Sequence, residues 1–206
     1  MIIKICGLRT LEHALVAAEA GADLIGLVFA PSRRQVSLAE ARAIAAAVRG
    51  LPAPRPQIVG LFVNTPAFEI NAVADSVGLD LVQLSGDESL VDAAGITRQI
   101  IKSIRMDGSA REAAWISAGA RLLVDAHVPG AYGGTGARAD WPQAAGLARC
   151  APLILAGGLD PMNVAEAIAQ VRPQGVDVSS GVEEGGVKRA ALIRAFVAAA
   201  RTATTL

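Results

Sequence analysis

The feature that most constrains the fold of this chain is a regular alternation of short apolar runs with longer segments of helical periodicity. Strands separated by helical segments are typical of βαβ units, whose strands pair in parallel within one sheet. The alternation therefore predicts an α/β fold with a parallel sheet. The strand-like runs cover residues 2–6, 23–29, 57–63, 81–85, 99–104, 121–125, 152–157 and 175–180.

The segments between these runs carry the spacing and the end signals of helices. Apolar residues recur three and four positions apart, as in Leu11, Leu15 and Ala18. Residues 86–98 have the least clear helical pattern. Predicted N-caps are Thr10, Ser37, Ser109 and Asp160, the last with Pro161 at the first helical position.

The number of strands separates two architectures. Eight strands in 206 residues leave about 26 residues for each strand–helix unit, near the lower end for an eightfold barrel. An open doubly wound sheet usually needs fewer strands, and its Gly-x-Gly-x-x-Gly fingerprint is absent after the first run. No flexible linker divides the chain, since residues 49–57 read as a stiff connector. We predict a single-domain (β/α)8 TIM barrel over residues 1–206.

Glycines add a weaker signal for the barrel. A glycine precedes or opens the second, fourth, sixth and eighth runs, at Gly21, Gly78, Gly119 and Gly175. Glycine commonly ends helices because it adopts a left-handed conformation without a steric penalty. A helix-ending glycine before every even strand suggests a repeating unit of two strands, although helix–strand joins favour glycine in general.

Composition excludes several classes of function. The formal net charge is zero and aromatic residues make up only 3%, so no basic footprint for nucleic acid is present. No apolar run approaches the ~18 residues of a membrane span. Two cysteines and two histidines without metal-site spacing predict neither a disulfide framework nor a structural metal. We expect a cytoplasmic protein that is a monomer or a homodimer.

In a barrel of this kind, reactive groups are expected at the carboxyl ends of the strands. Alternation along the first strand places Lys4 and Cys6 on one face and Ile3 and Ile5 on the other. A strand cysteine is more often a small buried hydrophobic residue, but a neighbouring ammonium would favour the thiolate and lower the pKa of Cys6. The sixth strand ends on Asp125, which could cap a turn or exchange a proton. An acid and a thiolate across a barrel mouth suit an isomerase or a hydrolase.

The seventh and eighth strands end in "ILAGGLDP" and "DVSSGVE". Glycine allows the backbone to approach a ligand, and the serines and free amides can donate to an anion, so we predict a phosphate site there. After the second strand, Arg33 or Arg34 could pair with a carboxylate, although loop arginines are usually solvated. Gln83 and Ser85 share a face of the fourth strand, while His13 and His127 are expected to play only local roles.

Seven motifs in order, from residue 2 to about 198, resemble the phosphoribosylanthranilate isomerases of tryptophan biosynthesis. They are "KICGLRT", "GADLIGLVFAPSRRQVS", "VGLFVN", "LVQLSGDE", "LLVDAHVPGAYGGTGARADW", "LILAGGLDPMNV" and "GVDVSSGVE". The resemblance implies an Amadori rearrangement in a single (β/α)8 barrel, without cofactor or metal. Its catalytic residues fall on Cys6, as general base, and Asp125, as general acid.

The resemblance also assigns binding residues. The carboxylate-binding arginine falls on Arg34, and Lys4, Gln83 and Asp177 complete the expected substrate-binding set. Phosphate binding falls on Gly157, Gly158, Ser180 and Gly181. Two departures stand out: Ser85 replaces a histidine common in relatives, and Arg189 replaces an aspartate after Lys188. The first bears on substrate packing, and the second on the cap of the last helix.

Three alternatives remain open from the sequence. Other phosphate-binding barrels, such as pentose-phosphate epimerases or indoleglycerol-phosphate synthases, would need paired carboxylates with metal ligands or a lysine–glutamate set, which the strand ends lack. A non-catalytic ligand-binding barrel would not need both Cys6 and Asp125. An isomerase of the histidine-pathway aminoimidazole carboxamide ribotide generally has paired aspartates instead of a cysteine. Residues 130–139 are interpreted as a lid or wall over the site.

Overall fold

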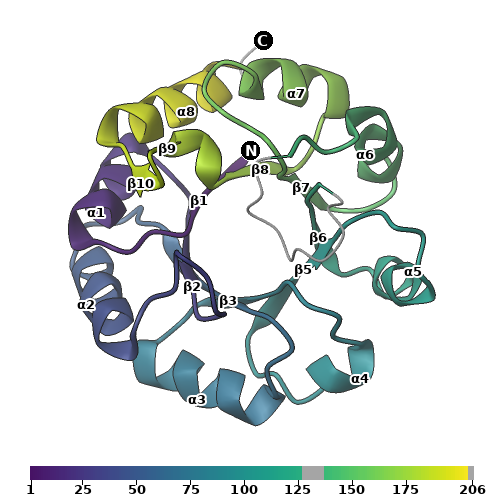
Figure 1. The fold of residues 1–206 in the computed structure, drawn as a ribbon, viewed down its shortest axis with the longest axis horizontal. Coiled ribbons are helices and arrows are strands. Elements are labelled where there is room, and N and C mark those ends of the chain that lie inside the picture. Colours follow the sequence, from purple (N-terminus) through teal and green to yellow (C-terminus); the bar gives the residue numbers. More distant parts are fainter. Residues whose placement is uncertain (127–136, 204–206) are drawn as a thin grey trace.

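Eight parallel strands close into a barrel, with each strand hydrogen-bonded to its neighbours in chain order and β8 returning to β1 (Figure 1). The computed structural model describes residues 1–126 and 137–203. The predicted (β/α)8 architecture is confirmed, and every predicted strand is present to within a few residues. The strands are β1 Ile2–Cys6, β2 Leu24–Val28, β3 Gln57–Phe62, β4 Leu81–Leu84, β5 Gln99–Ile104, β6 Arg121–Val124, β7 Leu153–Leu155 and β8 Gly175–Val178.

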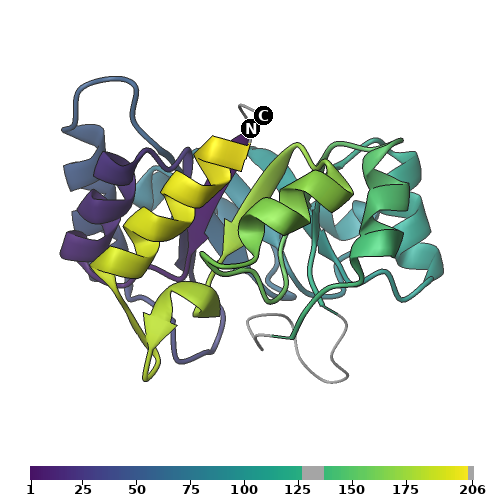
Figure 2. The same ribbon diagram turned by 90° about the horizontal axis from the view of Figure 1, so that it is seen from above.

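Helices surround the barrel as an outer ring (Figures 1 and 2). After β8, the 3-10 helix η1 (Ser180–Val182) and a two-stranded antiparallel sheet of β9 (Glu183–Glu184) and β10 (Val187–Lys188) precede the last helix. The helices are α1 Leu11–Ala20, α2 Leu38–Arg49, α3 Ala67–Val77, α4 Leu90–Ala93, α5 Ala110–Ser117, α6 Trp141–Ala148, α7 Val164–Val171 and α8 Ala190–Ala203.

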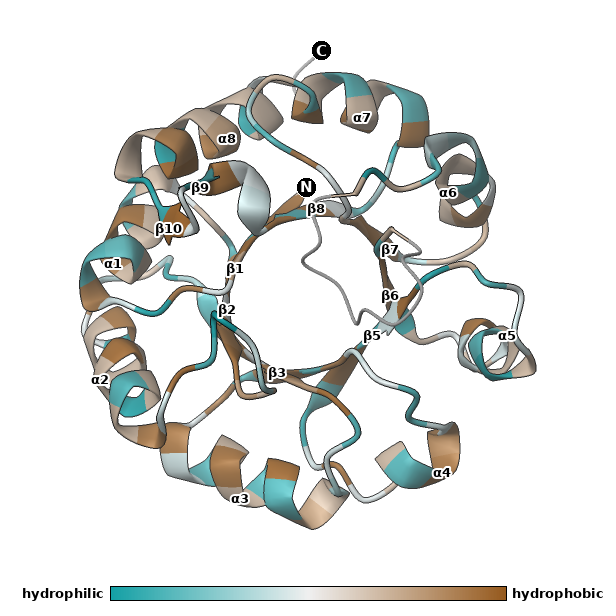
Figure 3. Ribbon diagram, viewed as in Figure 1, coloured by the Kyte–Doolittle hydropathy of each residue, from teal (hydrophilic) through white to brown (hydrophobic). Residues whose placement is uncertain are grey.

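The core has two parts, separated by the sheet. Outward-facing strand residues such as Ile3 and Ile5 pack with the buried faces of the helices in one large cluster. A smaller cluster fills the barrel interior and consists of Leu24, Val59, Leu81, Ile101, Leu123, Ile154 and Ala156. Apolar residues accordingly dominate the barrel strands, whereas the helices alternate between apolar and polar residues (Figure 3). This cluster fills the barrel below the carboxyl ends of the strands, where ligands of TIM barrels bind.

Most predicted helix starts are confirmed, and one is wrong. The side chains of Thr10, Ser37 and Ser109 each accept a hydrogen bond from the backbone N–H three residues later. Asp160 instead caps a turn, accepting from the N–H groups of Met162 and Asn163, and α7 begins only at Val164. The segment 86–98, weakest in the sequence, contains a single helical turn.

The predicted glycine repeat holds at three of its four positions. Gly21, Gly78 and Gly119 have positive φ angles of 92°, 73° and 68° at the ends of their helices. Gly175 does not, because it is the first residue of β8 and lies against the backbone of Ile2. The left-handed residue after α7 is Arg172, with φ 52°. The expected fourfold cap is therefore wrong at the last unit.

Within the described residues, no helix has both the length and the apolar character needed to cross a membrane.

Candidate active site

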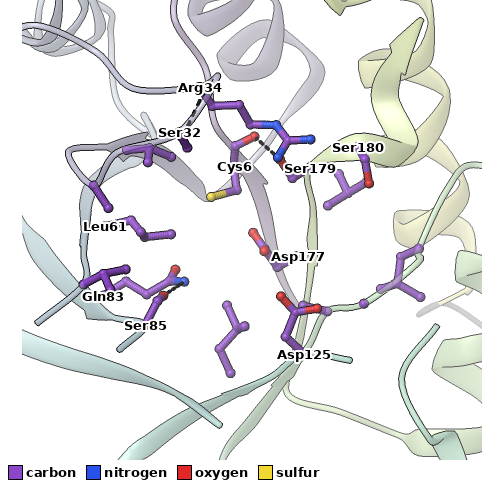
Figure 4. Close-up of a pocket in the computed structure, with 18 of the residues that line it drawn as sticks. Cys6, Ser32, Arg34, Leu61, Gln83, Ser85, Asp125, Asp177, Ser179 and Ser180 are labelled. Carbon is purple, nitrogen blue, oxygen red and sulfur yellow. Dashed lines mark hydrogen bonds between the residues drawn. The ribbon is translucent and has the colours of Figure 1, made fainter. Parts of the chain in front are cut away.

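A cavity of about 580 Å³ opens at the carboxyl ends of the strands (Figure 4). Its walls include apolar side chains of β2, β3 and β6, such as Val28, Leu61 and Leu123. Eight of the ten site residues predicted from the sequence line it: Cys6, Arg34, Gln83, Asp125, Gly157, Gly158, Asp177 and Ser180. Lys4 and Gly181 are not among the residues that line it.

Lys4 is fully buried beneath the cavity, where its ammonium donates to Asp177 Oδ1 at 2.8 Å. The pairing of β1 with β8 places the two residues side by side in the sheet. Burial alone would lower the pKa of Lys4, but the charges of Asp177 and Cys6 outweigh it and raise that pKa. Lys4 is therefore a permanent cation that holds the Asp177 carboxylate at the cavity floor.

Cys6 points into the cavity from the same face of β1 as Lys4, as predicted (Figure 4). Gly26, its partner on β2, makes room for both side chains, since a Cβ there would lie 2.9 Å from Cys6 Sγ and 3.2 Å from Lys4 Nζ. The expected lowering of the thiol pKa is wrong. Burial raises the pKa of Cys6, Lys4 opposes this, and the nearby Asp177 carboxylate raises it further.

Asp125 follows the last residue of β6 and faces the same cavity as Cys6 (Figure 4). Its backbone N–H continues the sheet by donating to Ile104 O, and its Oδ1 accepts from the N–H of Ala126 at 2.8 Å. The carboxylate is thus held at the mouth by both its strand and the following residue. With Asp177 between them, Cys6 and Asp125 form a row of titratable groups across the cavity.

The predicted phosphate residues lie where the β7 and β8 loops meet. Gly157 and Gly158 both have positive φ angles, 79° and 65°, and Ser180 is the first residue of η1. Gly181 lies directly behind the β7 loop, against Leu159 O. The N–H of Ala139 approaches Gly157 O at 3.4 Å, so residues 137–139 border this site. The rest of the predicted lid, residues 130–136, and His127 lie outside the described residues.

Arg34 reaches the cavity from the loop after β2, with its guanidinium bound to Glu183. Arg34 Nε donates to Oε1 at 2.7 Å and Nη2 to Oε2 at 3.0 Å. Arg33, the other candidate, also pairs with Glu183 but is half exposed. Arg34 is therefore the arginine placed for a ligand in the cavity. Glu183 was not predicted as a site residue, although it ends the quoted motif "DVSSGVE". It directly follows η1, and nothing in the sequence there indicated its contacts.

The β4 residues contribute a polar pair. Gln83 is buried, and its Nε2 donates to Ser85 Oγ at 3.0 Å. Gln83 Oε1 has no hydrogen-bond partner among the described residues. A buried amide oxygen aimed at a polar cavity is suited to accept from a ligand hydroxyl or amine. Ser85 thus orients the glutamine side chain.

The described parts of the chain contain no group of three or more His, Cys, Asp or Glu residues that could hold a metal ion. His13, expected to play a local role, pairs with Thr10 Oγ1 at the start of α1. That the reaction needs no metal stays a prediction.

The cavity at the barrel mouth combines a thiol, two carboxylates, an arginine and a pair of glycine-rich loops. The family model described as N-(5'-phosphoribosyl)anthranilate (PRA) isomerase matches residues 3–199. The chain belongs to this family. An N-(5'-phosphoribosyl)anthranilate isomerase of Roseiflexus sp. (strain RS-1) is 58% identical over 208 residues, covering 98% of each chain.

Solved structures agree with this membership in the phosphoribosylanthranilate isomerases. The crystal structure of the enzyme from Thermus thermophilus superposes with a TM-score of 0.85 at 36% identity, covering 98% of this chain and 99% of the other. A family member in complex with reduced 1-(o-carboxyphenylamino)-1-deoxyribulose 5-phosphate has a TM-score of 0.83 at 35% identity, covering 98% and 100%. The family, the TIM-barrel fold and the isomerase class implied by the sequence motifs are confirmed.

Proposed function

We propose that this chain converts N-(5'-phosphoribosyl)anthranilate into 1-(2-carboxyphenylamino)-1-deoxyribulose 5-phosphate, with Asp125 as general acid and Cys6 as general base. The observation that carries the proposal is one cavity lined by both groups, with an arginine and a glycine–serine loop pair at its rim. Such a cavity offers partners for the carboxylate and the phosphate of this substrate while its centre holds the acid and the base.

The reaction needs one proton donor and one proton acceptor. Asp125 gives its proton to the ring oxygen of the furanose, and the bond between that oxygen and C1 breaks to form an iminium between C1 and the anthranilate nitrogen. The iminium acidifies the C2–H bond, and Cys6 removes that proton to give an enolamine. Tautomerisation then delivers the ketone at C2. General acid–base catalysis of this kind typically contributes 10²–10⁴-fold.

Substrate binding follows the chemistry of the cavity wall. In this proposal, Arg34 binds the anthranilate carboxylate, and Gly157, Gly158 and Ser180 receive the phosphate, with Gly181 shaping the loop behind them. Asp177 and Gln83 accept hydrogen bonds from the ribose hydroxyls or the amine. Lys4 contributes by fixing Asp177. Action in the cytoplasm, no nucleic-acid partner and a monomeric or homodimeric state stay predictions from the sequence.

The direct test is turnover of phosphoribosylanthranilate by the purified chain, followed as loss of its anthranilate fluorescence, with and without chelator. We expect full activity in chelator. Cys6→Ser and Asp125→Asn should each lower kcat by roughly 100-fold or more, whereas Cys150→Ser, at the exposed cysteine, should leave kcat unchanged. Both Cys6 and Asp125 variants remaining near wild type would contradict the assigned roles.

The same assay with aminoimidazole carboxamide ribotide, run side by side, separates the anthranilate substrate from the histidine-pathway one. We expect turnover of the anthranilate substrate. Absence of turnover with either substrate, together with retained ligand binding, would instead indicate a non-catalytic barrel.

A further inference from the structure

A single carboxylate, Glu183, joins three cations beside the cavity. Arg34 donates to both of its oxygens, Arg33 Nη2 donates to Oε2 at 2.8 Å, and Lys188 Nζ lies 3.0 Å from Oε1. The side chains of Glu183 and Lys188 are only 4% and 5% exposed, and that of Arg34 is 11% exposed. Charge pairs this well buried are screened little by solvent, so their geometry is strongly determined.

The cations bound by Glu183 belong to different walls of the site. The stem of Arg34 crosses Gly7, where an added Cβ would lie 2.5 Å from Arg34 Cδ. Lys188 Nζ donates to Ser179 O at 2.8 Å and contacts Ser179 Oγ at 3.3 Å. Ser179 Oγ in turn donates to Cys6 O at 3.2 Å. One carboxylate therefore connects the ends of β1, β2 and β8.

The Glu183 contacts also define how Arg34 is presented. Two parallel N–H···O bonds to one carboxylate fix both the position and the plane of a guanidinium. Without the negative charge of Glu183, the positive charges of the largely buried Arg34 and Lys188 would repel each other, and removal of one partner from a buried ion pair is strongly unfavourable. Arg34 would then turn towards solvent, and Lys188 would lose its anchor beside Ser179.

We infer that Glu183 is a positioning residue for the isomerase reaction, one that presents Arg34 to the substrate carboxylate and holds the β8 loop for the substrate phosphate. This inference rests on the proposed function. It adds a role that neither the resemblance nor the cavity lining assigns, since Glu183 reaches the substrate only through Arg34 and Lys188.

The first test compares Glu183→Gln with Glu184→Gln, a matched control. Glu184 is the next residue of β9 and is paired with Arg189 on the exposed surface. We expect Glu183→Gln to raise KM for phosphoribosylanthranilate by roughly tenfold or more, with a smaller change in kcat, because charge-assisted contacts to the substrate are displaced. Glu184→Gln should stay within about twofold of wild type. A KM for Glu183→Gln within twofold of wild type would overturn the inference.

A second comparison separates positioning from a general loss of structure. In an Arg34→Ala background, Glu183→Gln should add little further to KM, since residues that act through one another are not additive. N-(5-phosphoribosyl)aniline lacks the carboxylate that Arg34 is proposed to bind. With this substrate, Glu183→Gln should lose the part of its effect on KM that depends on Arg34. Glu183→Asp, which keeps the charge, should restore part of the affinity. Fully additive effects with both substrates would show that Glu183 supports the fold rather than Arg34.

Calorimetric binding of reduced 1-(o-carboxyphenylamino)-1-deoxyribulose 5-phosphate provides a readout that does not need turnover. Weaker binding by Glu183→Gln, with Glu184→Gln unaffected, supports the inference even when a variant is inactive. Equal binding by wild type and Glu183→Gln contradicts it. Failure of the wild-type chain to turn over phosphoribosylanthranilate would contradict the proposed function alone.

Discussion

At the scale of single residues, the reactivity of Cys6 depends on two opposite charges, those of Lys4 and Asp177, which lie on neighbouring strands of the same sheet. Strand alternation was sufficient to predict that Lys4 and Cys6 share a face. It was not sufficient to predict the sign of the thiol pKa shift, because burial raises the pKa of Cys6 most, and the Asp177 carboxylate, 173 residues away from Lys4 in the chain, raises it further. The position of Lys4, two residues before Cys6, was enough to predict a nearby cation. The burial of the thiol and the paired Asp177 carboxylate become visible only in the closed barrel.

This arrangement predicts how the thiol titrates when the carboxylate is removed. The negative charge of Asp177 raises the pKa of Cys6, so Asp177→Asn should lower it and shift thiolate formation to lower pH. The rate of alkylation by iodoacetamide, measured against pH in a Cys150→Ser background, reports the thiolate of Cys6 alone. An unchanged or higher pKa in Asp177→Asn would show that Lys4, once unpaired, no longer acts on the thiol.

The contacts of Glu183 could not be predicted from sequence motifs. The general rule for barrels was enough to predict arginines and phosphate-binding residues at strand ends, but it does not extend to a residue beyond η1. The carboxylate becomes relevant because β9 folds back towards the loop after β2. The resulting contacts with Arg34 and Lys188 outweigh the effect of burial and lower the pKa of Glu183 to about 2.

At the scale of elements, local signals located strands and most helix starts but misjudged the β7–α7 connection. Asp160 followed by Pro161 has the composition of a helix start, yet its carboxylate closes a turn. That turn positions the side chain of Asn163, whose Nδ2 donates to Gly158 O at 2.9 Å. The same local chemistry serves a loop beside the cavity rather than the helix. Such competition between a cap and a turn is decided by the tertiary position of the loop.

The contact between the β7 and β8 loops provides an element-scale prediction. A Cβ on Gly181 would lie 1.9 Å from Leu159 O, which is rigid backbone, so Gly181→Ala must push the two loops apart. Because the predicted phosphate residues lie on these loops, we expect KM to rise by roughly tenfold.

Gly95→Ala is the control for this change. Its added Cβ would meet only the Ala67 side chain, at an ordinary 3.4 Å, far in sequence from either loop. Steady-state kinetics with phosphoribosylanthranilate checks both variants. An unaltered KM in Gly181→Ala would show that the spacing of the loops does not determine phosphate binding.

At the scale of the whole molecule, counting strands predicted closure, but closure itself depends on contacts between the chain's two ends. β8 pairs with β1, and α8 packs against α1. Arg201, in the last turn of α8, donates to Met1 O and Gly21 O at 2.8 Å and to Asp23 Oδ2 at 2.7 Å. Asp23 Oδ2 also accepts from the N–H of Ile3. No repeat count could have predicted this arginine, because its partners come from the opposite end of the sequence.

Arg201→Ala should therefore destabilise the whole barrel rather than one helix. Loss of hydrogen bonds from a charged donor to two carbonyls and a carboxylate is expected to lower the free energy of unfolding by about 1–2 kcal/mol, since the side chain is partly exposed. Arg194→Ala on the same helix removes only an exposed pair with Glu19 and should cost less than ~0.5 kcal/mol. Urea unfolding followed by circular dichroism measures both. Equal effects of the two substitutions would mean that the first and last units of the barrel are joined by their apolar packing alone, without help from this arginine.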